Sequence, residues 1–253
     1  MMVWGNITAV SYLNTIPFVF GINRASSSLH SKLLLDVPAK CSENFISGKA
    51  SIALIPAADL RLLSSYKLIT NYCIGAVSNV RTVVVVSNAP LDQITTIYLD
   101  SHSHTSVQLV KILAREKWNI TPAFEDLTDY STIDYNSSSK AYLLIGDKVF
   151  DNENKFTHTY DLAAEWIEHT SLPFVFAVWV ARDSVSSVEI DNLNRALHYG
   201  VTHIEEAVKE SIYMSNYIRN IKYLTENISF ELTESKRLAL RTFLQKIPPS
   251  SPN

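Results

Sequence analysis

The stretch Pro173–Ala181, PFVFAVWVA, decides the fold together with an earlier apolar run, Arg81–Ser87, RTVVVVS. Each run has the length and composition of a buried β-strand. We interpret them as the hinge strands that connect the two α/β lobes of one protein. Lobe one then comprises residues 1–86 plus 181–253, and lobe two comprises residues 87–180. The cleft between such lobes is the expected ligand site. A single sheet with these two strands at its centre is the alternative.

Strands and helices alternate on both sides of these runs. This βαβ-type pattern predicts mostly parallel sheets with helices on their faces. Ser186 and Glu189 fit a capping box before the helix expected over 188–210, and Gly48 is a suitable residue to end helix 38–47. The other expected strands are 5–10, 32–35, 50–55, 66–74, 97–100 and 141–145, and the other expected helices are 57–64, 104–117, 161–168 and about 233–247.

Composition and charge exclude several classes of protein. The 253 residues carry a net charge of −3, so no strong electrostatic attraction to nucleic acid or to an anionic membrane is expected. No apolar stretch reaches the roughly 18 residues that span a bilayer, and the N-terminus lacks the pattern of a signal peptide. We take Cys41 and Cys73 as buried free thiols and expect a cytoplasmic protein. These features do not predict its oligomeric state.

Polar side chains follow the first expected strand, in the segment Val10–Phe18, VSYLNTIPF. Pro17 stops the pairing of the strand because proline has no N–H to donate. Ser11, Tyr12 and Asn14 are therefore left at the carboxyl edge of the sheet, where ligands of open α/β sheets bind. We expect these three residues to contact a ligand.

A second polar segment, Leu99–Ser106, LDSHSHTS, joins an expected strand to an expected helix. Hydroxyls and free backbone N–H groups at a helix N-terminus favour a carboxylate or a phosphate, so Ser103, Thr105 and Ser106 are candidate anion ligands. Plain capping of the helix by Ser103 or Thr105 is the alternative. The close histidine pair His102 and His104 does not amount to a metal site, and we expect none.

Two further strand ends carry candidate residues. Arg81 and Thr82 lead into the first hinge strand, where the guanidinium of Arg81 can pair with a carboxylate. An arginine on the solvent edge of a strand is the alternative. Gly146 and Asp147 follow the strand 141–145, and Asp147 either contacts the ligand or caps the next turn. The pattern predicts a small-molecule protein with an anion-binding cleft, but no particular reaction.

Short motifs along nearly the whole chain resemble those of the chorismate dehydratase family of the futalosine route to menaquinone. Each motif is weak alone, whereas their joint order and spacing are specific. In chain order they are SYLNTIP at 11–17, DVP at 36–38, ALIP at 53–56, VRTV at 80–83, LD followed by S, T and S within 99–106, LIGD at 144–147, YDLAAEW at 160–166, LPFVFAVW at 172–179 and YLT at 223–225.

The resemblance implies a fold similar to the type II periplasmic binding proteins. It implies a lyase that removes water from chorismate, its small-molecule partner, to leave 3-[(1-carboxyvinyl)oxy]benzoate in menaquinone biosynthesis. It implies neither a metal nor an organic cofactor.

The resemblance also implies roles for individual residues. Asn14 is implied as catalytic, with an amide that donates to the departing hydroxyl or orients a carboxylate. Thr82 is implied as its partner, at a position where the family commonly has serine. The sequence shows no obvious general base near Asn14, so we hypothesise that the substrate's own enolpyruvyl carboxylate takes the proton, held by Asn14 and Thr82. His104 departs from the family, which usually has a basic residue there, often arginine.

Two other functions suit such a fold. A non-catalytic binding protein for small carboxylates predicts an export signal or a lipid-modified cysteine. An effector-binding lobe of a regulator predicts a DNA-binding segment upstream of the first strand. The sequence as given displays neither feature, and we expect the dehydratase.

Overall fold

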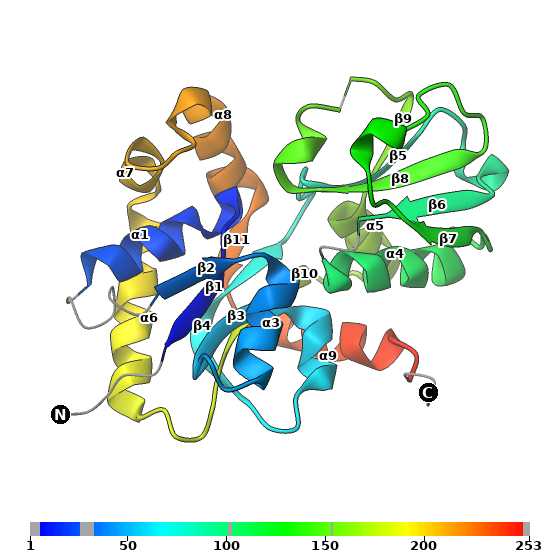
Figure 1. Cartoon of the computed structure of the whole chain (residues 1–253). Coiled ribbons are helices and arrows are strands. Elements are labelled where there is room, and N and C mark those ends of the chain that lie inside the picture. The colour runs from blue at the N-terminus through cyan, green and yellow to red at the C-terminus, as the bar shows by residue number, and fades with distance from the viewer. Residues whose placement is uncertain (1–5, 26–32, 101–102, 153, 250–253) are drawn as a thin grey trace. The chain divides into compact units, whose positions relative to one another are not determined.

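The structure is a computed structural model that describes residues 6–25, 33–100, 103–152 and 154–249. It divides into two compact α/β units, each assembled from two segments of the chain (Figure 1). Unit 1 comprises residues 1–76 and 175–233, and unit 2 comprises residues 77–174 and 234–253. Among the described residues, no helix combines the length and the apolar character needed to cross a bilayer.

Unit 1 contains a six-stranded mixed sheet in the order β11-β4-β10-β3-β1-β2. β1 is parallel to β2 and β3, whereas β10 is antiparallel to β3 and β11 is antiparallel to β4. Every residue of β3 and β10 is buried, which explains why both strands are unbroken apolar runs in the sequence. The strands are β1 Ile7–Val10, β2 Leu33–Asp36, β3 Ile52–Pro56, β4 Lys67–Ala76, β10 Phe174–Ala181 and β11 Ser229–Glu231.

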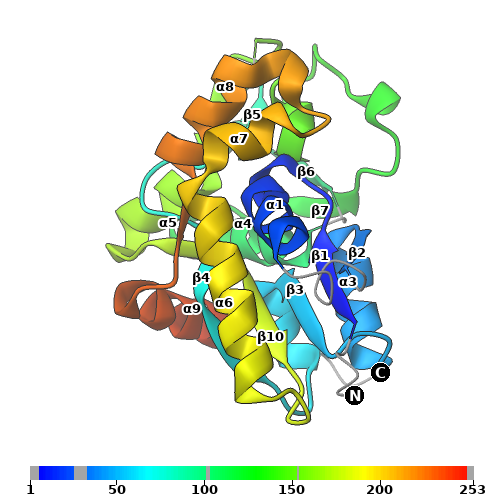
Figure 2. The ribbon, with the colours of Figure 1, turned by 90° about the vertical axis from the view of Figure 1, so that its left-hand side faces the viewer.

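Two glycines set the packing of the helices of unit 1. α1 (Ile16–Arg24) lies against α6 (Ser187–Thr202), as Figure 2 shows, and Gly21 and Gly200 form the contact. A Cβ atom added to either glycine would lie 1.9 or 1.7 Å from a backbone oxygen of the other helix. The two helices therefore touch backbone to backbone. The other helical segments are α3 Pro38–Ile46, α7 Ile204–Lys209, α8 Tyr217–Lys222, the 3₁₀ turns Leu13–Thr15, Ala57–Leu62 and Met214–Asn216, and the π-turn Tyr223–Asn227.

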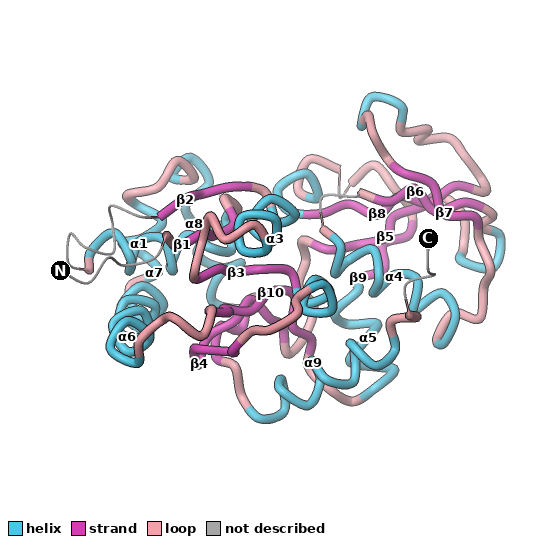
Figure 3. Tube along the Cα trace, turned by 60° about the horizontal axis from the view of Figure 1, so that its bottom comes forward, coloured by secondary structure: helices cyan, strands magenta, loops and turns pink. Residues whose placement is uncertain are grey.

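Unit 2 contains a five-stranded mixed sheet in the order β7-β6-β8-β5-β9. β6 is parallel to β7 and β8, whereas β5 is antiparallel to β8 and β9. α4 (His104–Glu116) packs on α5 (Leu162–Thr170), and Figure 3 shows α9 (Glu234–Lys246) beside α5. The strands are β5 Val83–Ser87, β6 Thr96–Leu99, β7 Ala123–Asp126, β8 Lys140–Ile145 and β9 His158–Asp161, and the 3₁₀ turns are Leu91–Gln93, Tyr130–Thr132 and Gly146–Val149.

Several sequence predictions are confirmed. The chain is a two-lobed α/β protein, and the two long apolar runs are buried strands. Ser186 and Glu189 form the predicted capping box at the start of α6. Gly48 follows α3 with a φ of 79°, the left-handed conformation expected of a residue that ends a helix.

Other predictions were wrong. The sheets are mixed rather than mostly parallel, because strand direction is not encoded in an apolar pattern. The helix expected over 188–210 breaks at His203 into α6 and α7. α1 was not predicted, although Pro17 stands in its first turn, where proline is well tolerated.

The division into units differs from the expected lobes. The boundaries lie at 76/77 and 174/175 rather than at 86/87 and 180/181, and a third lies at 233/234. β5 and β10, the strands expected at the hinge, are members of the two sheets. α9 belongs to unit 2 because Phe243 packs edge-on against Trp166 and Phe174, with ring centroids 6.0 and 5.1 Å apart.

Candidate functional site

In unit 1, the turn after β1 carries the predicted residues Ser11, Tyr12 and Asn14. The hydroxyl of the buried Thr15 donates to the carbonyl oxygens of Val10 (2.5 Å) and Tyr12 (2.7 Å), which closes the turn. Ser11 is exposed in this arrangement, and Tyr12 and Asn14 are half-buried. The turn therefore presents polar groups at the carboxyl end of β1, as predicted.

Ser11 and Tyr12 line a groove of about 500 Å³ that lies wholly within unit 1. Its other walls come from Thr15 and α1, from Leu35 of β2, and from Ala207 of α7 with the segment that follows it. Asn14 is not among the residues that line this groove. The groove has the size of a small-molecule site, and two of the three predicted residues reach it.

In unit 2, the register of the sheet brings the other candidate residues to one edge. β5 begins where β8 ends, because Val83 pairs with Ile145 in antiparallel register. β6 is parallel to β8 and ends at the same edge, immediately before Asp100. We call this the unit 2 edge and define it by Arg81, Thr82, Asp100, Ser103, Gly146, Asp147 and Lys148.

Thr82 and Gly146 are neighbours on the unit 2 edge. The N–H of Gly146 donates to the carbonyl oxygen of Thr82 over 2.7 Å. Gly146 has a φ of 70°, which favours glycine, and no described residue other than its two chain neighbours lies within 4 Å of where its Cβ would be. Thr82 is 2 % exposed, whereas Gly146 and Asp147 are half-buried. A ligand can therefore approach the backbone of Gly146 closely.

The start of α4 forms a hydroxyl cluster on the same edge. Ser103 caps the helix by accepting from the N–H of Ser106 over 3.4 Å, and the two hydroxyl oxygens are 3.0 Å apart. Thr105 and Ser106 are fully buried, while His104 is exposed. Capping by Ser103, the alternative to anion binding, is thus present. Ser101 and His102 lie outside the described residues.

A charged cluster that the sequence did not predict lies beside the start of α4. The carboxylate of Asp100, whose side chain is 2 % exposed, accepts from the hydroxyl of Tyr130 and from Lys148 Nζ at 3.2 Å. Lys148 Nζ also lies 3.9 Å from the centre of the Tyr130 ring. The Lys148 side chain remains 43 % exposed. Its ammonium is held in place and can still reach a ligand.

Arg81 is held by a neighbouring carboxylate. Its φ is 63°, a left-handed conformation that is uncommon outside glycine, and its N–H donates to Asp161 over 2.7 Å. Its guanidinium carbon lies 5.7 Å from the centre of the Phe150 ring. Burial raises the pKa of Asp161, although N–H groups of four backbone residues act to lower it.

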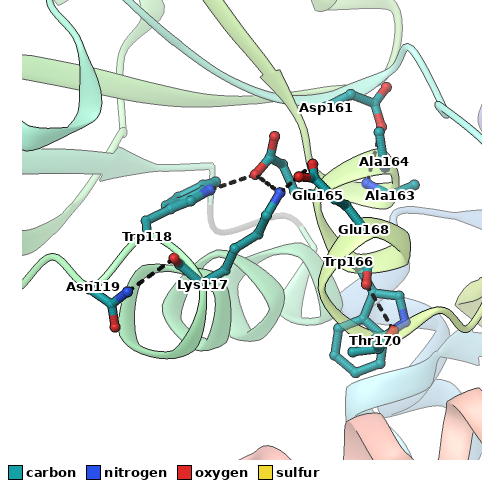
Figure 4. Close-up of polar contacts among 10 residues, drawn as sticks. All are labelled: Lys117, Trp118, Asn119, Asp161, Ala163, Ala164, Glu165, Trp166, Glu168 and Thr170. Atoms are coloured by element: carbon teal, nitrogen blue, oxygen red, sulfur yellow. Dashed lines mark hydrogen bonds and ion pairs between the residues drawn. The ribbon is translucent and has the colours of Figure 1, made fainter.

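The far end of α4 carries a second charged network (Figure 4). Lys117 Nζ donates to Glu165 (2.6 Å) and Glu168 (2.8 Å), and Trp118 Nε1 donates to Glu165 (2.7 Å). This network joins α4 to α5 at the end opposite Ser103, so we interpret it as structural. Within the part of the chain that the structure describes, no group of three or more His, Cys, Asp or Glu side chains is arranged to hold a metal ion.

The sequence contained a partial signal for the residues that were missed. Asp100 directly follows a strand, as the predicted site residues do, and Lys148 directly follows Asp147. Tyr130 carries no such signal, because it lies in a 3₁₀ turn between β7 and β8 and does not directly follow a strand. These three side chains meet only because of the order and register of the strands in the folded sheet.

Comparison with known proteins relates the chain to a family. A family model described as "Menaquinone biosynthesis" matches residues 6–248. A curated chorismate dehydratase from Thermus thermophilus is 24 % identical over 261 aligned residues, covering 91 % of this chain and 95 % of that protein.

Solved structures extend the comparison to the fold. A protein from Archaeoglobus fulgidus matches with a TM-score of 0.74 and 15 % identity, over 95 % of both chains. A Candida albicans protein, described as exhibiting the generic periplasmic binding protein fold, matches with a TM-score of 0.62 and 13 % identity, over 96 % of this chain and 90 % of its own. At such identities, these structures speak for the fold alone.

Proposed function

The chain belongs to the menaquinone biosynthesis family, and from that premise we propose that it is a chorismate dehydratase of the futalosine route. The reaction is the loss of one water from chorismate, which leaves 3-[(1-carboxyvinyl)oxy]benzoate. A proton leaves ring C3 and hydroxide leaves C4, and the ring becomes aromatic. Because aromatisation supplies the driving force, the enzyme has mainly to position the substrate and to stabilise charge.

The unit 2 edge is the observation that carries this proposal. Chorismate bears two carboxylates, and the edge offers two cations, Arg81 and Lys148, beside the accessible backbone of Gly146. Arginine and lysine are both suited to carboxylates, and arginine can bind one through two N–H groups. Ser103 and Asp147 complete the proposed binding surface of unit 2, whereas Thr105 and Ser106 are fully buried and are assigned no contact with the substrate.

In unit 1, we assign catalysis to Asn14. Its amide N–H donates to the departing hydroxyl or orients the enolpyruvyl carboxylate, which accepts the C3 proton. Ser11 and Tyr12 bind the substrate from the same turn. Thr82, the second residue that the family resemblance implies, lies on the unit 2 edge, where its carbonyl oxygen holds Gly146 in place.

The test is direct incubation of the purified protein with chorismate, followed by liquid chromatography with mass detection. Loss of one water with a benzoate chromophore is the expected result, and Asn14→Ala and Asn14→Asp should abolish most of the turnover. The alternative is a non-catalytic binding protein for small carboxylates, which suits the fold of the structural neighbours. Thermal stabilisation by chorismate without turnover would favour that alternative, and near-full turnover by Asn14→Ala would remove Asn14 from catalysis.

A further inference from the structure

Asp161 uses both of its carboxylate oxygens, and it uses them for different partners. Its Oδ1 accepts from the N–H groups of Val80 (3.1 Å), Ala163 (3.0 Å) and Ala164 (3.1 Å). Its Oδ2 accepts from the N–H of Arg81 over 2.7 Å. The residue thus connects the segment before β5 to the junction of β9 and α5.

Capping explains only part of this arrangement. The bonds from Ala163 and Ala164 satisfy the free N–H groups at the start of α5, where these residues are drawn in Figure 4. The bonds from Val80 and Arg81 join residues about 80 positions away in the chain. A helix cap does not need them, so they serve the segment that enters β5.

The backbone of that segment is strained at Arg81. Three non-glycine residues of the described chain have a positive φ: Arg81, Asn119 and Ser171. Ser171 is the cap residue at the end of α5, and Asn119 follows the end of α4 by three positions, so both lie where the left-handed conformation commonly ends a helix. Arg81 instead precedes a strand. A strained residue persists only where its surroundings hold it, and such residues gather at functional sites.

We infer that Asp161 is the positioning residue of the unit 2 edge, because its Oδ2 holds the backbone of Arg81 in the left-handed conformation and thereby aims the guanidinium. The guanidinium of Arg81 lies over the ring of Phe150, which directly follows the turn Gly146–Val149. This inference rests on the proposed function for the identity of the ligand. The geometry of Asp161 and Arg81 is independent of the proposed function.

The variant Asp161→Asn tests the role selectively. If the amide oxygen keeps the place of Oδ1, three of the four hydrogen bonds remain and α5 stays capped. The amide NH₂ then faces the N–H of Arg81, donor against donor, which breaks that contact alone. We expect the KM for chorismate to rise about tenfold, as befits the loss of one charge-assisted hydrogen bond, while kcat changes less.

A second readout needs no substrate. Amide hydrogen exchange, followed by NMR, should show that Asp161→Asn loses protection at Arg81 and retains it at Ala163 and Ala164. The control is Asp134→Asn, since Asp134 of unit 2 also accepts a backbone N–H through one carboxylate oxygen, that of Asn136 over 3.0 Å, and Asn136 is not part of the unit 2 edge. It should leave both KM and exchange at Arg81 unchanged.

The two readouts separate two kinds of failure. Unchanged exchange at Arg81, or an unchanged KM in an active Asp161→Asn enzyme, would overturn the positioning role. If the wild-type protein neither converts chorismate nor is stabilised by it, the proposed function fails. The exchange experiment then still decides whether Asp161 holds Arg81.

Discussion

At the scale of single residues, two features at the unit 2 edge lower the stability of the folded protein. The left-handed conformation of Arg81 costs an L-residue about 1–2 kcal/mol. Asp161 is half-buried, and its partial burial disfavours the charged form of the carboxyl and raises its pKa. Neither feature is needed to complete the sheet. Both features are understandable if ligand binding requires the Arg81 guanidinium to be held in this position.

Substitution of Arg81 by glycine should therefore separate stability from binding. Glycine adopts a φ of 63° without strain but loses about 0.5–1 kcal/mol in chain entropy, so the net effect on the free energy of unfolding ranges from neutral to about 1.5 kcal/mol more stable. Without the guanidinium, we expect KM for chorismate to rise tenfold or more. Thermal denaturation and steady-state kinetics measure the two effects. A clear fall in Tm would show that Arg81 is there for stability.

Lys148 gives a second prediction at this scale. Lys148→Gln removes the ammonium that the buried Asp100 holds, and we expect a several-fold higher KM with a smaller change in kcat. The matched control is Lys155→Gln, because Lys155 also lies over a tyrosine ring, that of Tyr135, but its hydrogen bond goes to Asn152. Equal kinetic effects of the two variants would contradict a role for Lys148 in binding.

At the scale of secondary structure elements, the backbone contact of α1 with α6 is the feature most sensitive to substitution. In an isolated helix, glycine to alanine is favourable by about 1 kcal/mol. At Gly21 the added methyl would lie 1.9 Å from a backbone oxygen of Ala196, which no side-chain rotation relieves. The steric cost must therefore exceed the gain in helix propensity.

We accordingly expect Gly21→Ala to destabilise the protein by about 3 kcal/mol, despite the better helix propensity of alanine. Urea unfolding followed by circular dichroism measures the change. Gly48→Ala is the control: its methyl meets nothing closer than 3.8 Å, so only the positive φ opposes it, at about 1–2 kcal/mol. A stabilised Gly21→Ala protein would mean that α1 and α6 lie farther apart than described.

The elements also show what the sequence can predict. β3 and β10 are predictable because a short run that is apolar at every position and rich in β-branched or aromatic residues is typical of a buried strand. α1 is harder to predict because Pro17 suits the end of a strand, whereas proline in a first turn equally begins a helix. The short strands β7 and β9 have exposed or half-buried residues at every position and carry little apolar signal.

The residues of the candidate site also differ in how well local sequence predicts them. Ser11, Thr82, Ser103 and Gly146 are predictable because they stand at the ends of strands or at the start of a helix, which local sequence reveals. Asp100, Lys148 and Tyr130 were missed because their meeting depends on which strands are neighbours. Asp161 stands out in the sequence only as part of a motif, since its partner Arg81 is 80 residues away.

At the scale of the whole molecule, two separate segments of the chain form unit 2. After it completes unit 1 at residue 233, it returns to unit 2 as α9. Phe243 of this helix is 1 % exposed and packs on Trp166 and Phe174. The core of unit 2 is therefore incomplete without the last helix of the chain.

Phe243→Ala should weaken unit 2 and spare unit 1. Removal of a buried phenylalanine side chain costs about 3–5 kcal/mol. Hydrogen exchange with mass detection should show faster exchange in peptides of α4, α5 and β5, with unchanged exchange in β1, β3 and α6. The reverse result would assign α9 to the lobe that the sequence pattern suggests, residues 1–86 plus 181–253.

The attachment of α9 should also depend on pH. Glu116 of α4 accepts from Lys246 of α9 over 2.5 Å and from Arg115 over 2.6 Å, and His169 lies 3.5 Å away. Burial acts to raise the pKa of Glu116, but the hydrogen bonds and charges of Lys246 and Arg115 outweigh it and hold the pKa below the ordinary 4.5. Because the pKa is lower in the folded protein, this ion pair stabilises the protein above about pH 4.5 and the stabilisation is lost as pH falls through the folded pKa.

We thus expect the protection of α9 against hydrogen exchange to fall at acid pH before that of the unit 1 sheet. Glu116→Gln removes the titrating group, so the protection of α9 in this variant should be lower at neutral pH and should depend less on pH over the same range. An unaltered pH dependence in Glu116→Gln would show that Phe243, and not the ion pair, holds the chain end in unit 2.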